Sequence, residues 1–351
     1  EEHRVEHALR HANVLNAVAE NEDIAGCFGW CMFDYNTHKD FGSGDRICYH
    51  GVLDMFRNPK LAAVIYASQQ EKEPVLELSS SMDIGEHPGC NRGETYVFTN
   101  ADKVRMFKND RFIKEYSAAD SPYKYLKHGP ILIDDFIGDA LKEEHMKPGQ
   151  EAGVKKALNA FTRFGFARLP KSIYLTGAWM ILRYHMNMEE AVRLYNKYIG
   201  DWGGTSTTYH FEAVMVDPAT GQERVVKTII KEPMTERKLS VVADHENLVE
   251  KESYDVAAVR IQAQDEHGNI LPFYNDPLTF ETEGPIEVIG PKIVSLQGGM
   301  GGTYVKTKKI AAGEPQKAAL IIHDGENEIK IGFTVQSQIE RKQKRWQTDQ
   351  K

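Results

Sequence analysis

The chain has 351 residues, of which 41% are hydrophobic and 27% charged. This balance excludes a disordered protein, and the length predicts two or three domains of ordinary size. The net charge of −8 argues against nucleic acid as a partner, because no basic field is available to replace the counterions of a phosphate backbone.

The first seventy residues alternate between helical and buried-strand patterns. Residues 2 to 19 have a helical period, and the apolar run from Ile24 to Phe33 lacks polar alternation, as in a strand buried on both faces of a parallel sheet. A loop rich in Gly and Asp follows over residues 34 to 47. Pro59 then opens a second apolar helix that reaches Tyr66. This order predicts the remnant of an α/β barrel over residues 1–70, too short to be a complete barrel.

Residues 71–235 change to short strands with a helical stretch inside them. Leu76/Leu78, Tyr96/Phe98 and Val104/Met106 alternate with polar residues, which is typical of a half-exposed antiparallel sheet. Helical stripes then recur from Val154 to Ile199, and we expect Trp179 and His185 to pack there. We therefore predict a β-sandwich domain with a helical insertion at about residues 119–205.

The last third of the chain is all β in pattern. Val259/Ile261/Ala263 and Ile329/Ile331/Phe333/Val335 alternate, and Glu266-His267-Gly268-Asn269 makes a turn. Short strands with regular turn signals predict an immunoglobulin-like β-sandwich over residues 236–338. Residues 339–351 form a basic tail, which we interpret as a solvated terminus. No apolar run approaches the roughly 20 residues of a membrane span.

Cysteine and histidine patterns give no strong signal for a metal. Four cysteines are too few for a disulfide scaffold and lack the paired spacing of a zinc site. His3, His7 and His11 recur every four residues on the first predicted helix, and two such residues could bind a metal. An exposed polar face explains them more simply. We therefore expect neither a metal nor another cofactor.

The stretch from Gly26 to Asp40 is the richest in candidate site residues. Barrel enzymes place their sites at the C-terminal ends of the strands, where Trp30 and the polar residues after it would lie. An indole ring can stack on the apolar face of a sugar, while Asp34, Asn36 and His38 can bond hydroxyls. The competing interpretation is that Trp30 belongs to a core. Composition alone favours this second interpretation, because pockets and cores use the same residues.

Residues 25 to 69, AGCFGWCMFDYNTHKDFGSGDRICYHGVLDMFRNPKLAAVIYASQ, resemble the final strand and helix of the catalytic barrel in glycoside hydrolase family 2 β-galactosidases. The resemblance implies a retaining glycosidase that hydrolyses terminal β-D-galactosides with two carboxylates about 5 Å apart. It places the nucleophile and the acid/base upstream of Glu1. We therefore expect no catalytic residue in this chain, and no activity from the chain alone.

The same resemblance assigns substrate-binding residues. Trp30 would be the aromatic platform for the galactosyl ring, and Asp34 would support the pocket or bond a hydroxyl. Tyr35, Asn36 and His38 are weaker candidates on the following loop. The related β-glucuronidases use an Asn-x-Lys-Gly stretch to hold a substrate carboxylate, but Cys48-Tyr49-His50-Gly51 stands in its place here. This departure favours a neutral sugar.

Partners and location follow from these expectations. We expect a galactoside-containing carbohydrate as partner, and self-association through the truncated barrel, whose strand edge and apolar helix face would be exposed. The alternative function is a non-catalytic carbohydrate-binding or scaffold β-sandwich module. Location stays open between the bacterial cytoplasm, the periplasm and secretion.

Overall fold

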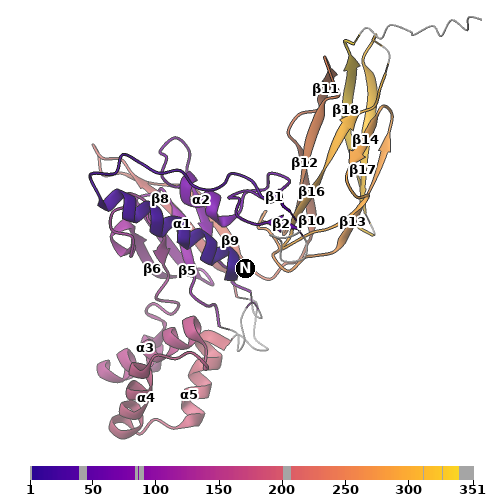
Figure 1. Cartoon of the computed structure of the whole chain (residues 1–351). Coiled ribbons are helices and arrows are strands. Elements are labelled where there is room, and N and C mark those ends of the chain that lie inside the picture. Colours follow the sequence, from indigo (N-terminus) through magenta and orange to yellow (C-terminus); the bar gives the residue numbers. More distant parts are fainter. Residues whose placement is uncertain are drawn as a thin grey trace, which may run out of the picture. The chain divides into compact units, whose positions relative to one another are not determined.

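A computed structural model describes residues 2–38, 46–83, 86, 91–200, 207–310, 312–325 and 327–339. The chain divides into two compact units, each described here by itself. The first consists of Glu1–Met32 and Pro59–Glu236, and the second of Phe33–Asn58 and Arg237–Lys351. Figure 1 labels most of the helices and strands of both units.

Two helices of the first unit pack against each other. They are α1 (Glu2–Glu20) and α2 (Leu61–Ala67), which confirms the two helices predicted in this region. The small side chains of Ala8 and Ala12 on α1 are fully buried, as are Ala62 and Ile65 on α2. Small residues on α1 let the helix axes approach closely, so that this contact buries apolar surface with few large side chains.

The buried strand predicted for residues 24 to 33 is wrong. The segment lies outside the regular strands, Phe28 is fully exposed, and Trp30 is 74% exposed. A strand needs neighbours that pair with its N–H and C=O groups. Among the described residues, the bridge between Phe33 and Leu53 is the one strand-like pairing that this run makes. The apolar composition predicted burial, but no second layer among the described residues covers the segment.

Two antiparallel sheets share the main core of the first unit. One has the order β3-β4-β7 and the other the order β6-β5-β8-β9. Their strands are β3 (Leu76–Leu78), β4 (Tyr96–Thr99), β5 (Lys103–Lys108), β6 (Arg111–Ser117), β7 (Ile131–Leu132), β8 (Tyr209–Val216) and β9 (Glu223–Lys231). Alternate side chains of both sheets point into one cluster, which includes Leu76, Val97, Val104, Met106 and Phe211.

Helices occupy the chain between β7 and β8 and gather apart from the strands of this unit (Figure 1). They are α3 (Pro148–Phe164), α4 (Lys171–Tyr184), α5 (Met188–Tyr195) and a π-turn (Asn196–Gly200), preceded by a 3₁₀ turn at Ala140–Glu144. A further 3₁₀ turn, Ala118–Asp120, lies between β6 and β7. A separate apolar cluster holds them together, formed by Ile137, Leu141, Val154, Leu158, Met180, Leu194 and Ile199. None of the helices in the described residues is long and apolar enough to cross a membrane.

The expectation that Trp179 and His185 pack within the helical stretch is wrong. Trp179 is 57% exposed, and His185 is an exposed left-handed residue that ends α4. The helix buries Ile173 and Met180, which lie seven residues, or about two turns, apart on one face. Trp179 precedes Met180 by one residue, so its side chain points about 100° away from the packed face.

The second unit is a β-sandwich with a short hairpin. Its sheets have the orders β10-β12-β16-β14 and β11-β18-β17-β13-β15. Their strands are β10 (Lys238–Ala243), β11 (Asn247–Glu250), β12 (Val256–Gln264), β13 (Pro277–Glu283), β14 (Ile286–Ile289), β15 (Ile293–Ser295), β16 (Met300–Thr307), β17 (Gln316–His323) and β18 (Glu328–Ser337). β11 and β18 pair in parallel, whereas the other pairs of this sandwich are antiparallel.

The core of the sandwich follows the alternation read in the sequence. Val259, Ile261 and Ala263 of β12 are fully buried, and Phe333 and Val335 of β18 join the same cluster from the other sheet. The predicted alternation is therefore confirmed in these strands.

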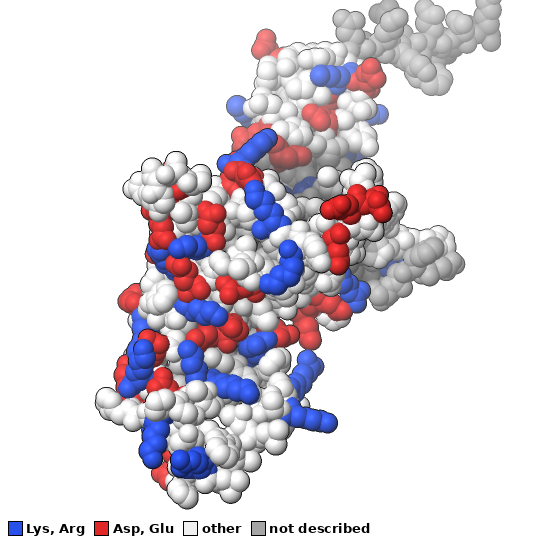
Figure 2. Space-filling view, turned by 90° about the vertical axis from the view of Figure 1, so that its left-hand side faces the viewer, with Lys and Arg blue, Asp and Glu red and all other residues white. Residues whose placement is uncertain are grey.

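Charged side chains of both signs are interspersed on the face shown in Figure 2. Charged side chains of the first unit form cross-strand ion pairs, such as Lys103 Nζ with Glu223 Oε1 at 2.6 Å and Arg105 Nε with Glu115 Oε2 at 2.9 Å. Pairs as exposed as these contribute little stability each, so the apolar clusters hold the unit together.

Candidate functional site

Four of the five candidate residues lie in one hairpin of the second unit, which starts from Asp34. The hairpin consists of β1 (Tyr35–Asn36) and β2 (Ile47–Cys48), paired antiparallel. Asp34 comes directly before β1 and is 5% exposed. Its backbone N–H donates to Leu53 O at 3.0 Å, and its carboxylate Oδ1 accepts from the N–H of Gly51 at 2.8 Å. Asp34 therefore joins both ends of the hairpin.

Any residue other than glycine at position 51 would require the neighbouring backbone to move. A Cβ at this position would overlap the backbone nitrogen of Asp34 and the carbonyl carbon of Phe33. The close approach is what lets the Gly51 N–H reach the carboxylate. Absence of a side chain at residue 51 is therefore part of how Asp34 is held.

The remaining hairpin candidates are exposed. Tyr35 and Asn36 pair with Cys48 and Ile47, so their side chains point to opposite faces of the ribbon. Both side chains are open to solvent, as is that of His38. The fixed backbone and the open side chains together suit a loop that contacts a polar ligand. Residues 39 to 45 of the predicted Gly- and Asp-rich loop lie outside the described residues.

Trp30 lies in the first unit. Its exposure of 74% contradicts the interpretation that it is a core residue. The neighbouring Met32 is exposed as well. The indole face is therefore free of the packing that would prevent it from stacking on a ring.

A partly buried polar network that follows the hairpin was not predicted from the sequence. Asp54 Oδ1 accepts from the N–H groups of Phe56 and Asn58, both at 2.8 Å, and Asp54 Oδ2 accepts from Asn58 Nδ2 at 2.8 Å. Asn58 Nδ2 also donates to Gly301 O at 2.7 Å, which ties this turn to β16. Burial raises the pKa of the Asp54 carboxyl, while the hydrogen bonds from Asn58 oppose that shift. An Asp with an Asn four residues later, just before a Pro, was the available signal for such a turn.

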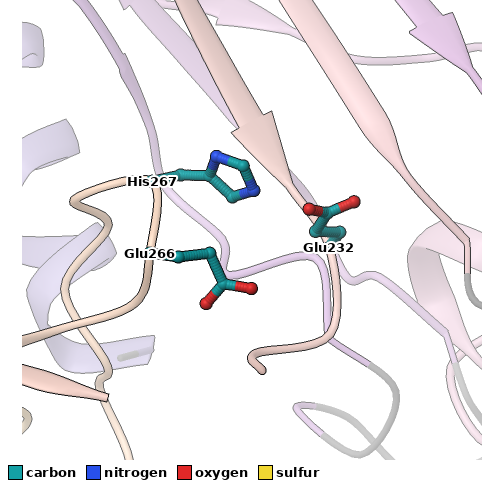
Figure 3. Close-up of side chains that lie close together, drawn as sticks. All are labelled: Glu232, Glu266 and His267. Atoms are coloured by element: carbon teal, nitrogen blue, oxygen red, sulfur yellow. The ribbon is translucent and has the colours of Figure 1, made fainter. Parts of the chain in front are cut away.

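A second polar turn follows β12. The Asp265 carboxylate accepts from the N–H groups of His267 at 2.9 Å and Asn269 at 2.7 Å, as the turn chemistry of this stretch predicts. Figure 3 shows the side chains of Glu266 and His267 projecting from this turn. Glu232, also drawn there, belongs to the first unit, where it accepts a hydrogen bond from Thr208 Oγ1 at 2.9 Å.

Comparison with known proteins places the chain in context. No model of a known protein family matches the sequence. The β-galactosidase of Thermoanaerobacterium thermosulfurigenes is 31% identical over 302 residues, which are 85% of this chain and 34% of that protein. The β-galactosidase of Thermoanaerobacter pseudethanolicus is 30% identical over 308 residues, which are 87% of this chain and 33% of that protein.

The chain is related to the β-galactosidases of glycoside hydrolase family 2. Solved structures agree in fold. The structure of a β-glycosidase from Bacteroides vulgatus has a TM-score of 0.54 and 13% sequence identity to this chain. The match covers 92% of this chain and 32% of the chain of that β-glycosidase. The structure of a β-glucuronidase from glycoside hydrolase family 2 has a TM-score of 0.53 and 13% sequence identity to this chain. The match covers 95% of this chain and 28% of the chain of that β-glucuronidase.

The resemblance to family 2 β-galactosidases that was predicted from residues 25 to 69 is thereby confirmed, and it extends over most of the chain. The chain spans about a third of the length of the β-galactosidases that it matches. It is consistent with a C-terminal part of a family 2 enzyme.

Proposed function

We propose that this chain is part of a retaining glycosidase that hydrolyses terminal β-D-galactosides in oligosaccharides. The observation that supports this most directly is the similarity to proteins named β-galactosidase over 85% of the chain. The exposed Trp30 and the anchored hairpin add chemistry that suits a sugar. An open indole face can stack on the apolar face of a galactosyl ring, and polar side chains beside a fixed backbone can bond hydroxyls.

The residues divide into two roles in this proposal. Trp30 is the stacking platform, and Asn36 and His38 bond hydroxyls, with Tyr35 as a further contact. Asp34 holds the hairpin in shape, because its carboxylate is buried and already accepts the N–H of Gly51. A neutral sugar is favoured, since Cys48 and His50 stand where the resemblance to β-glucuronidases would require Asn and Lys.

The proposal also covers the rest of the fold. Residues 24 to 33 would become the last strand of a catalytic barrel in a longer protein, which would cover the apolar side chains that are exposed here. Residues 1–70 would be the barrel remnant, 71–235 a β-sandwich domain with the helical insertion, and 236–338 an immunoglobulin-like sandwich.

The catalytic carboxylates belong to the longer protein in this proposal. A retaining mechanism needs a nucleophile and an acid/base about 5 Å apart. We place both outside this chain, so the purified chain should not hydrolyse p-nitrophenyl β-D-galactopyranoside. Turnover that persists in the pure chain after contaminating glycosidases have been excluded would contradict this part of the proposal.

Galactose binding tests the site itself. Saturation-transfer NMR should show galactose contacting the chain, with a weaker signal for glucose. Trp30→Ala should abolish the galactose signal, whereas Trp179→Ala, which removes another exposed indole, should leave it unchanged. If both variants bind galactose as the unchanged chain does, Trp30 is not the platform. The alternative of a binding module in the β-sandwiches would then take its place.

A further inference from the structure

Two histidines on α1 meet at their ring nitrogens. His7 and His11 lie four residues apart, so their side chains share one face of the helix. Their Nε2 atoms are 3.1 Å apart, with the rings inclined at 73°. Both side chains are partly exposed. The sequence spacing predicted a shared face, but the convergence of the two Nε2 atoms is a finding of the structure.

Tyr66 of α2 holds His11 from the opposite side of its ring. The Tyr66 hydroxyl is 2.9 Å from His11 Nδ1. Either the Tyr66 hydroxyl or His11 Nδ1 donates in this contact. In both cases one Nε2 atom of the histidine pair carries a proton, and the other Nε2 atom accepts it with its lone pair. The pair of imidazoles therefore shares a single proton at a point toward which both rings aim a nitrogen.

We propose that His7 and His11 bind a divalent late-transition-metal ion, with Zn²⁺, Ni²⁺ and Cu²⁺ as the fitting ions. The shared proton would move to Nδ1 of the ring that carries it, so that both imidazoles stay neutral and each offers the lone pair of its Nε2 to the metal. Imidazole nitrogens are suitable ligands for these ions. Water or a small ligand would fill the remaining positions, because the pair is open to solvent on one side.

The spacing of the nitrogens fits such a site. Zinc binds imidazole nitrogen at about 2.0–2.1 Å, which puts two such nitrogens roughly 2.9 Å apart at a right angle and roughly 3.4 Å apart at a tetrahedral angle. The observed separation of 3.1 Å lies between these limits. The two nitrogens therefore already have the separation that a bound zinc ion requires.

Tyr66 is the positioning residue of the site. A hydrogen bond to the nitrogen that does not bind the metal fixes the tautomer and the orientation of a ligand histidine. Gly29 packs against the same hydroxyl, since a Cβ there would lie 2.6 Å from Tyr66 Oη. The tyrosine is thus restrained from two sides. This proposal does not depend on the proposed glycosidase function.

The chain offers a matched control for testing the site. His3 is exposed and lies four residues before His7 on the same helix, so His3→Gln removes an imidazole while keeping both proposed ligands. After treatment with EDTA, the whole chain is titrated with ZnCl₂ in a calorimeter at pH 7.5. We expect His7→Gln and His11→Gln each to weaken binding at least about tenfold, and His3→Gln to bind as the unchanged chain does.

Two further readouts separate a metal site from a loss of structure. Electron paramagnetic resonance of bound Cu²⁺ should report two nitrogen ligands in the unchanged chain and in His3→Gln, and fewer in His7→Gln. Tyr66→Phe keeps both ligands and should weaken Zn²⁺ binding severalfold while leaving the nitrogen count at two. Equal Zn²⁺ affinity in His7→Gln and the unchanged chain, with the helix content intact by circular dichroism, would overturn the proposal.

Discussion

Gly51 donates its backbone N–H to the buried carboxylate of Asp34 at 2.8 Å across the neck of the hairpin. The two residues are 17 positions apart and lie on either side of the candidate sugar-contacting residues Tyr35, Asn36 and His38. The contact closes the loop at its base, so the exposed side chains project from a segment whose ends are fixed.

Substitution of Gly51 by Ala should destabilise the second unit. The added methyl group meets the backbone of Phe33 and Asp34, which cannot rotate aside as a side chain can. We expect a loss of about 2 kcal/mol in the free energy of unfolding, measured by urea denaturation. Gly332→Ala is the control, because a Cβ there meets nothing within 4 Å. An equally small loss of stability in Gly51→Ala and Gly332→Ala would contradict the close approach of Gly51 to the backbone of Phe33 and Asp34.

Removal of the Asp34 carboxylate should separate its anchoring role from its charge. Asp34→Ala leaves the buried N–H of Gly51 without its acceptor, which costs about 1–3 kcal/mol. Asp34→Asn keeps an oxygen acceptor and should cost less. Thermal melting of both variants tests this order. The anchoring role would be excluded if the Asn variant were as unstable as the Ala variant.

The helical stretch should lose stability in acid through Glu144. Arg193 Nη2 and Lys197 Nζ each lie 2.7 Å from its carboxylate, and these hydrogen bonds lower the pKa of Glu144 from 4.5 to about 2. A carboxyl with a lowered folded pKa stabilises the fold above the unfolded pKa. This stabilisation is therefore lost as the pH falls from about 4.5 toward 2.

Glu144→Gln isolates this effect. The unchanged chain should have the higher urea midpoint at pH 7, and the gap to Glu144→Gln should shrink as the pH approaches 2. Glu189→Gln removes a carboxylate elsewhere in the same helical stretch and serves as the control for net charge. A gap that stays constant between pH 7 and pH 2 would show that the ion pairs contribute nothing to stability.

The apolar run before the hairpin should make the isolated chain self-associate. Phe28 is fully exposed, and Trp30 and Met32 are largely exposed beside it. Phe28→Ser should shift the sedimentation profile toward the monomer at micromolar concentration. Phe273→Ser, which removes another exposed phenylalanine, should not. A monomeric unchanged chain at the same concentration would disprove association through this segment.

Sequence patterns were most informative where both partners of a contact belong to this chain. Val259, Ile261 and Ala263 alternate because one face of β12 meets the opposite sheet, and the structure buries all three. The run from Ile24 to Phe33 has the composition of a buried strand, but composition does not say what covers it. The described residues supply no layer for it, so the predicted strand does not form here.

The same distinction applies to the side chains of the candidate sites. Spacing placed His7 and His11 on one helix face, but Tyr66, 55 residues beyond His11, could be added only from the fold. The motif pointed to Asp34 as a pocket residue, while its bond to Gly51 depends on how the chain returns after β2. Tertiary contacts of this kind leave no periodic mark in a single sequence.

The parallel pairing of β11 with β18 has a mechanical consequence. Asn247 faces Thr334 and Glu250 faces Ser337, so the start of β11 and the end of β18 lie at opposite ends of the pair. A force that pulls these two ends apart slides the strands past each other, because they run in the same direction. All their hydrogen bonds then carry the load together, and this edge of the sandwich resists stretching better than a hairpin opened one bond at a time.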